Sequence, residues 1–323
     1  MNSERSTLVD DLVRRAEFGR PRSIGALTLV PLYGAIALPA YRTAGDALSA
    51  GDLTIGEVGN GNVPELMVSN RAPLPVLIVE GEHLQGARQN RILNSSVLVD
   101  AGADTVIPVS CVERGRWAYG GRSKASLGLD MAYPALRAMK HQQVGQSVRT
   151  SATRRSDQAA IWTEIERKRS SLSAGASPTG AMGDAFDHRR VDLEALLGSF
   201  PEPLRNQCGV MAFGGRHPLA VDIFDRPSTL RSLWPRLIRG YALDALTARR
   251  SRPEPFSIRG FLAALFDPNA MVTSHPGIGL GEDVVVTSQI VTAMALTWSG
   301  GVVHLAAIPV RGGRTATRTW FRA

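Results

Sequence analysis

A chain of 323 residues, 44% of them hydrophobic, is long and apolar enough to form a globular protein of one or two domains. It has 37 basic residues, 29 acidic residues and only two cysteines, which argues against a disulfide framework and predicts a cytoplasmic protein. The acidic N-terminus lacks the apolar core of a signal peptide. The uncharged runs at 23–41 and 284–310 are interrupted by proline, glycine or polar residues, so we expect no membrane span.

The chain begins with a predicted helix within residues 1–22, in which Leu8, Val9, Leu12 and Val13 share one apolar face. Segments rich in β-branched residues and bounded by turn residues then predict strands. They span 24–32, 53–58, 63–70, 74–81, 92–99 and 105–113. The connections are too short for crossover helices, so the sheet should be mainly antiparallel.

The composition changes between about 120 and 200, where we expect an Arg-rich helical insertion. Its best helix, at 157–169, places Ile161, Trp162 and Ile165 on one face, and Glu164 should pair with Lys168 four residues later. Shorter helices are predicted at 134–141 and 191–200.

The last third of the sequence returns to alternating strands and helices. Strands are predicted at 207–215 and 218–224, helices at 227–248 and 257–266, and a β-region at 271–310, read as a hairpin over its second half. The predicted fold class is α+β, with one mainly antiparallel β-core built from early, middle and late segments and helical excursions between them. The predicted organisation is an N-terminal helix within 1–22, a single domain at 23–312 and a tail at 313–323.

The positive charge is concentrated in one stretch. Residues 114–170 contain twelve basic and four acidic side chains, a surplus of 12 − 4 = 8 that equals the net charge of the whole chain. Such a field would attract phosphates or nucleic acid. The alternative interpretation is a solvated, partly mobile Arg-rich segment.

A run of polar residues, EGEHLQGARQNR at 80–91, follows an apolar strand and is predicted as a wide loop. Glu82 there is a candidate general acid or base, because burial raises the pKa of a carboxyl group toward neutrality. Gln89, Asn90 and Arg91 carry the donors and acceptors that a phosphate or a base edge requires. Alternatively, these side chains hold the loop closed, with Arg91 neutralising Glu80 or Glu82.

A second group of reactive side chains ends the strand at 105–113. Cys111 is a candidate nucleophile, although a lone strand cysteine is more often a small buried hydrophobe. Glu113 is a second candidate acid or base, and Arg116 with Trp117 could grip a nucleotide by charge and by stacking. The two polar runs leave strands of the same predicted sheet, so we expect them to converge in one cleft.

The histidines are scattered and form neither HExxH nor HxH, so we predict no metal site. The glycines of GIGLGED at 277–283 imitate a dinucleotide fingerprint, but a strand follows them where a helix is needed. We therefore expect them to be turn residues.

Over roughly residues 20 to 310, the sequence resembles the ARPP domain family. The resemblance rests on five blocks in this order: EGEHLQGARQNRILNSSVLV, IPVSCVERGRW, QAAIW, GVMAFGGRHPLAVDIFDRP and LIRGYALDAL. ARPP stands for ARG and Rhodanese-Phosphatase-superfamily-associated protein, and ARG for ADP-ribosylglycohydrolase. The family has no established activity. Two positions depart from the family pattern: His83 stands where an acidic residue is frequent, and Ala87 stands where a second glycine is frequent.

The resemblance implies a setting of RNA repair or nucleotide modification, with a nucleotide, an ADP-ribose derivative or an RNA end as ligand. Under one hypothesis the protein is an enzyme in which Glu82, Glu113 or Cys111 does the chemistry, and Gln89, Asn90, Arg91, Arg116 and Trp117 hold the ligand. Under the alternative it is a non-catalytic binding or assembly module that recruits a partner enzyme, or forms a homo-oligomer, and its polar motifs are structural. No cofactor is indicated.

Overall fold

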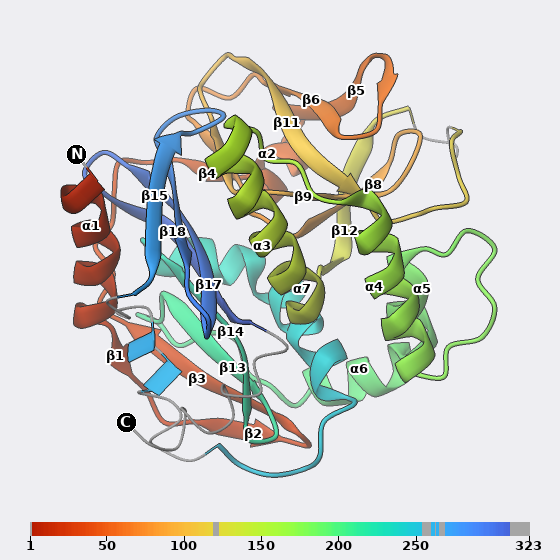
Figure 1. The fold of residues 1–323 in the computed structure, drawn as a ribbon, viewed down its shortest axis with the longest axis vertical. Coiled ribbons are helices and arrows are strands. Elements are labelled where there is room, and N and C mark those ends of the chain that lie inside the picture. The colour runs from red at the N-terminus through yellow and green to blue at the C-terminus, as the bar shows by residue number, and fades with distance from the viewer. Residues whose placement is uncertain (1, 119–122, 254–259, 262, 265–268, 311–323) are drawn as a thin grey trace.

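The computed structural model describes residues 2–118, 123–253, 260, 261, 263, 264 and 269–310. Two β-structures, a large open sheet and a closed barrel, are joined by helices (Figure 1). The predicted α+β class and its antiparallel character are confirmed, since every pairing in the sheet and the barrel is antiparallel. The predicted helix at 257–266 falls mostly outside the described residues, as does the tail at 313–323.

The open sheet combines early, middle and late segments of the chain, as predicted. Its strand order is β1-β3-β13-β14-β18-β17-β16-β15, with β2 also paired to β3. The strands are β1 (Glu17–Phe18), β2 (Arg22–Ile24), β3 (Leu27–Tyr33), β13 (Gly209–Gly214), β14 (His217–Phe224), β15 (Met271–Pro276), β16 (Glu282–Thr287), β17 (Val291–Trp298) and β18 (Gly301–Pro309). The hairpin predicted in the late region is β17–β18, and the GIGLGED glycines form the turn between β15 and β16.

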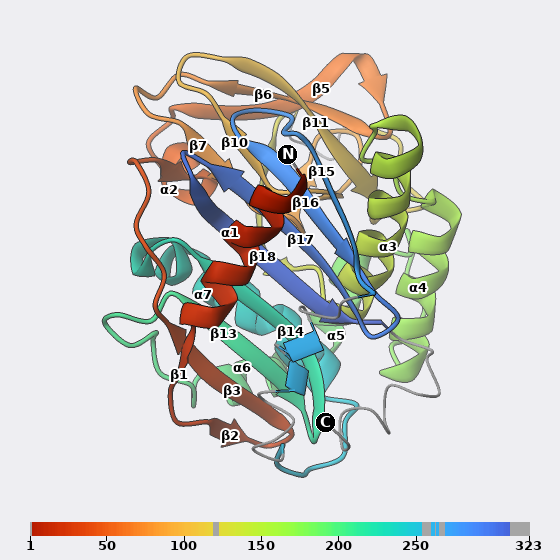
Figure 2. The same cartoon turned by 60° about the vertical axis from the view of Figure 1, so that its left-hand side comes forward.

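Both faces of this sheet are buried at its central strands, such as β13, β17 and β18, which explains why these strands read as continuous apolar runs. Along β13, Met211 and Phe213 point to the face covered by helix α1 (Asn2–Arg15), while Val210 and Ala212 point to the opposite face. Figure 2 shows α1 lying across the sheet on its outer side. The opposite face packs against the helices that connect the sheet to the barrel.

The barrel is closed by six strands in the order β11-β6-β5-β12-β8-β9. They are β5 (Leu53–Asn62), β6 (Glu65–Asn70), β8 (Glu82–Gly86), β9 (Arg91–Leu93), β11 (Asp104–Cys111) and β12 (Ala125–Met131). Its interior is a separate apolar core, to which Ile55, Val68, Leu84 and Ile107 contribute. A small sheet of β4 (Arg42–Thr43), β7 (Val76–Ile78) and β10 (Val97–Val99) and the short helix α2 (Ala44–Ser49) contribute to the same core.

The connecting helices are α3 (Pro134–Ser151), α4 (Gln158–Ser171), α5 (Met182–His188), α6 (Arg190–Leu197) and α7 (Pro227–Ala245). In α4 the predicted face is buried through Ile161 and Ile165. The predicted pair of Glu164 with Lys168 is wrong. Glu164 instead pairs with Arg167, and Lys168 pairs at 2.5 Å with the buried carboxylate of Asp244 on α7, where burial of both groups strengthens their attraction.

The polar run at 80–91 is not a wide loop. Its residues form the hairpin of β8 and β9, and their polar side chains are mostly buried. Gly86 (φ 111°) and Ala87 (φ 50°) both occupy the left-handed backbone region in the turn. Glycine adopts that region without strain, whereas the side chain of Ala87 makes it less favourable.

A cluster of buried charges joins the sheet, the barrel and α3. Arg137 on α3 donates from Nε to Glu80 Oε1 at 2.7 Å and from Nη1 to Asp222 Oδ2 at 3.0 Å. Lys140 donates to Glu80 Oε2 at 2.5 Å, and His304 Nε2 lies 3.1 Å from Asp222 Oδ1. All five side chains are at most 1% exposed. We call them the junction cluster.

Candidate functional site

Several of the predicted site residues lie at one corner of the barrel, where the β8–β9 turn meets the end of β11. The backbone N–H of Asn90 donates to Glu113 Oε2 at 3.1 Å, and Gln89 Nε2 donates to the Glu113 carbonyl at 3.2 Å. Arg116 donates to Glu113 Oε2 at 2.9 Å and to Asn90 Oδ1 at 3.0 Å. The two polar runs therefore converge, and their groups are bonded to one another.

Arg91 completes this corner from the inside. Its guanidinium is fully buried and donates to both carboxylate oxygens of Glu57, at 3.0 and 3.1 Å. Its alternative pairing with Glu80 or Glu82 is wrong, because Arg91 pairs instead with Glu57 on β5, a strand that does not neighbour β9 in the barrel. Trp117 is 44% exposed, and the guanidinium carbons of Arg88 and Arg91 lie 5.7 and 5.8 Å from its ring centre.

The chemistry available at this corner is limited by its burial and its bonds. Cys111 is 0% exposed, its thiol donates to the Glu113 carbonyl at 3.2 Å, and burial raises its pKa. Burial would also raise the pKa of Glu113, but the bonds from Arg116 and Asn90 lower it below the ordinary value. A protonated thiol is a poor nucleophile, and a stabilised carboxylate is a poor proton donor.

Glu82 lies apart from that corner. It is 1% exposed and accepts from the Val79 backbone N–H at 2.8 Å and from Arg236 Nη2 of helix α7 at 3.1 Å. Burial raises the pKa of Glu82, and Arg236 only partly opposes that rise. Glu82 and Glu113 are therefore shifted in opposite directions.

Arg236 forms part of the wall of a hollow of about 560 Å³ between α2, β12 and α7, which we call the α7 hollow. It is lined by Gly45, Leu48, Ser49, Ser126, Leu127, Gly128, Leu129, Pro235, Arg236 and Arg239. Helix α7 lies close to the end of β12 because Gly240 faces the carbonyls of Met131 and Ala132, where a Cβ would come within 3.0 and 3.2 Å of their oxygens. This approach brings the two arginines over the strand.

Each arginine of the α7 hollow is held by a carboxylate. Arg239 donates from Nε to Asp130 Oδ1 at 2.7 Å, as Arg236 does to Glu82. Burial raises the pKa of Asp130 as well, with Arg239 opposing. A guanidinium has five N–H donors, and these bonds use only one on each arginine. Leu48, Leu127 and Leu129 supply an apolar wall beside them.

The size and lining of the α7 hollow fit a small organic anion. Its volume lies within the roughly 300–1,000 Å³ typical of ligand pockets, which combine apolar walls with a few placed polar groups. Planar guanidiniums match the oxygens of phosphate and carboxylate groups. Arg236 and Arg239 were not among the residues predicted from the sequence. The sequence pattern that could have identified them is their spacing of three residues, which places both on one face of a predicted helix.

Part of the charge surplus of residues 114–170 is neutralised by acidic side chains from other parts of the chain. Within the described part of that stretch, seven basic side chains are ion-paired: Arg116, Arg137, Lys140, Arg154, Arg167, Lys168 and Arg169. The partners of Lys140 and Arg154 are Glu80 and Asp283, which lie far away in the sequence. The surplus in the sequence is therefore not a measure of the positive field at the surface.

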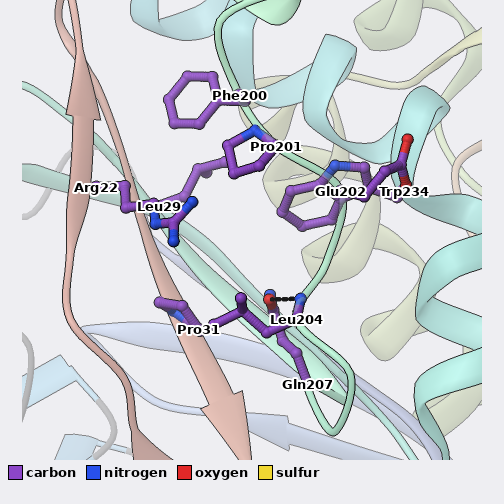
Figure 3. Close-up of a pocket in the computed structure, with 9 residues that line it drawn as sticks. All are labelled: Arg22, Leu29, Pro31, Phe200, Pro201, Glu202, Leu204, Gln207 and Trp234. Carbon is purple, nitrogen blue, oxygen red and sulfur yellow. Dashed lines mark hydrogen bonds between the residues drawn. The ribbon is translucent and has the colours of Figure 1, made fainter.

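Two other features are poor candidates for a small-molecule site. The first is a hollow between β3, α7 and the segment after α6, whose side chains Figure 3 shows, including the bond from Leu204 N–H to Gln207 Oε1. Its volume of about 20 Å³ holds little more than one water molecule. The second is the junction cluster, whose side chains are paired and shielded from solvent.

Within the ranges that the structure describes, no three histidine, cysteine or acidic side chains are grouped to hold a metal ion. Those ranges also contain no helix long and apolar enough to cross a membrane. The model of one protein family matches residues 15–308, and its description is the ARG and Rhodanese-Phosphatase-superfamily-associated Protein domain. No curated protein and no solved structure matches the chain.

Proposed function

Since the chain belongs to the ARG and Rhodanese-Phosphatase-superfamily-associated Protein domain family, we propose that it binds a phosphate-bearing, nucleotide-type ligand in the α7 hollow. The ligand classes are an ADP-ribose derivative and a phosphorylated RNA end. The proposal rests mainly on one observation. Arg236 and Arg239 line a hollow of about 560 Å³, and each has N–H donors that its bond to a carboxylate does not use. The family description, which associates the domain with phosphatase-related proteins, supports a ligand that carries phosphate.

In this proposal the two arginines bind the phosphate, and Leu48, Leu127 and Leu129 contact the less polar part of the ligand. Glu82 and Asp130 orient the arginines from behind, as carboxylates do for guanidinium groups. Burial raises the pKa of Glu82, but Glu82 does not line the α7 hollow, so we propose that it positions Arg236 and does not contact the ligand.

We propose a structural role for the other predicted site residues. Gln89, Asn90, Arg91, Glu113 and Arg116 hold the barrel corner together through the bonds described above. None of them lines the α7 hollow. They therefore support the barrel on which β8 places Glu82, and we propose no direct ligand contact for them. Trp117 and Cys111 belong to the same corner.

A thermal-shift screen tests the proposal with AMP, ADP-ribose and a short 5′-phosphorylated RNA. A ligand at 100 times its dissociation constant adds about 2.7 kcal/mol to stability. With an unfolding entropy of about 2.1 cal/mol/K per residue, 323 residues give about 0.7 kcal/mol/K, so the midpoint should rise by about 4 °C.

The matched variants are Arg239→Gln and Arg231→Gln. Both residues lie on α7 and lose the same charge, but Arg231 is exposed and does not line the α7 hollow. The ligand-induced shift should fall to less than half in Arg239→Gln and stay unchanged in Arg231→Gln. The proposal fails if no ligand of the panel shifts the wild type, or if both variants lose the shift equally.

A further inference from the structure

A second hollow, of about 570 Å³, lies where the turn between β13 and β14 meets the chain that leaves α7. In Figure 1 this place is at the lower end of the molecule. We call it the basic hollow, and its lining residues are Gly214, Arg216, His217, Thr247, Ala248, Arg249, Arg250 and Ser251. Four of these eight described residues are arginine or histidine, and none of the eight is acidic.

The backbone holds the two halves of the basic hollow in place. Gly215 lies in the left-handed region (φ 61°), and a Cβ there would collide with the carbonyl oxygen of Arg249. Its backbone N–H donates to the Ala26 carbonyl at 2.7 Å, which ties the turn to the neighbouring strand. The turn is therefore packed directly on the segment after α7, with Arg216 and His217 on one side and Arg249 and Arg250 on the other.

The arginines of the basic hollow differ from most of those elsewhere in the molecule. In the described residues, the guanidiniums of Arg216, Arg249 and Arg250 make no hydrogen bond and no ion pair. By contrast, Arg137, Arg154 and other basic side chains of the helical region are bonded to carboxylates. Three like charges around one concavity focus a positive potential there, which attracts anions.

We propose that the basic hollow binds a polyphosphate chain, meaning two or more linked phosphate groups. Three guanidiniums match the charge of such a chain better than that of a single phosphate. The hydroxyls of Thr247 and Ser251 line the same hollow and add donors. Among the described residues, the lining contains no phenylalanine, tyrosine, tryptophan or leucine on which a base could pack, so the proposal assigns the recognition to the phosphates.

This inference does not depend on the α7 hollow, and one set of titrations separates the two. Isothermal titration of the full chain with sodium tripolyphosphate at low salt should show binding by the wild type. The double variant Arg216→Gln/Arg250→Gln should weaken that binding at least tenfold. Arg239→Gln should change it by less than twofold, because Arg239 belongs to the other hollow.

A matched double variant, Arg155→Gln/Arg205→Gln, controls for net charge. It removes the same two charges from exposed arginines outside the basic hollow, and it should leave the dissociation constant within twofold. All four substituted arginines are exposed, so each protein should fold like the wild type. In Arg239→Gln, which weakens the α7 hollow, ATP should bind about as tightly as tripolyphosphate, because the described lining of the basic hollow offers its base no apolar surface.

Several results would overturn the inference. They are an absence of tripolyphosphate binding by the wild type, an equal loss in the two double variants, or a loss in Arg239→Gln alone. A single-stranded RNA that binds through Arg216 and Arg250, and that tripolyphosphate fails to displace, would instead assign the basic hollow to a nucleic-acid backbone.

Discussion

Replacing Arg137 by methionine tests what the junction cluster does. Arg137 is the only guanidinium that we find between Glu80 and Asp222 in the described structure, and it is bonded to both at 0% exposure. Burial would raise the pKa of Glu80, but Arg137, Lys140 and His141 hold it well below its usual range. Removing Arg137 leaves a buried carboxylate, Asp222, without its main cationic partner.

The expected cost follows from this geometry. Removing one partner of a buried ion pair destabilises a protein by about 3–5 kcal/mol, because the remaining charge stays buried and uncompensated. With an unfolding entropy of about 0.7 kcal/mol/K for a chain of this length, the melting midpoint should fall by about 4–7 °C. Adding Asp222→Asn to Arg137→Met should recover part of the loss, since the buried charge left without its main cationic partner is then removed.

Differential scanning calorimetry of the purified variants provides the assay, and Arg167→Met provides the matched control. Arg167 is paired to Glu164 in the same helical region, but its side chain is half exposed, so its pair should contribute less than about 1 kcal/mol. The reasoning is refuted if Arg137→Met melts within 1 °C of the wild type, or if Arg167→Met loses as much.

Two further predictions concern buried groups near the barrel. Burial lowers the pKa of His83 from 6.5 to about 4, so its stabilising effect is complete above pH 6.5 and is lost as the pH falls toward 4. Between pH 7 and 4.5, urea unfolding should therefore show a loss of about 2–3 kcal/mol that His83→Gln lacks, and equal losses in both proteins would contradict this assignment. Cys111 and Cys208 are buried with raised thiol pKa values, so neither should react with Ellman's reagent before unfolding. Rapid labelling of Cys111 in the native protein would show that the barrel corner opens.

The elements with a clear period were predicted well from the sequence. The face of α4 through Ile161 and Ile165 and the β17–β18 hairpin follow from local spacing alone, and the structure contains both. The division of the β-structure into a sheet and a barrel was not predicted. It depends on which strands pair, such as β11 with β9 and β6, and local patterns do not specify pairings between distant strands.

The polar residues were harder to interpret, because their role depends on partners far away in the sequence. The run at 80–91 resembled a loop, yet it forms a hairpin whose Arg91 is neutralised by Glu57 on another strand. The same limit applies to the Arg-rich segment, where Arg154 pairs with Asp283, 129 residues later. In the candidate site, Glu82 was identified from its place after an apolar strand. Arg236 was missed because the contact between α7 and the barrel is tertiary.

The central claim is that Arg239 contacts a phosphate group in the α7 hollow. Isothermal titration calorimetry gives four dissociation constants, for adenosine and for AMP with the wild type and with Arg239→Gln. Together they form a double-mutant-type cycle in which the phosphate and the arginine are removed separately. The account predicts that removing the phosphate weakens binding at least tenfold more in the wild type than in Arg239→Gln. Equal losses in the two proteins, or an absence of AMP binding by the wild type, would contradict it.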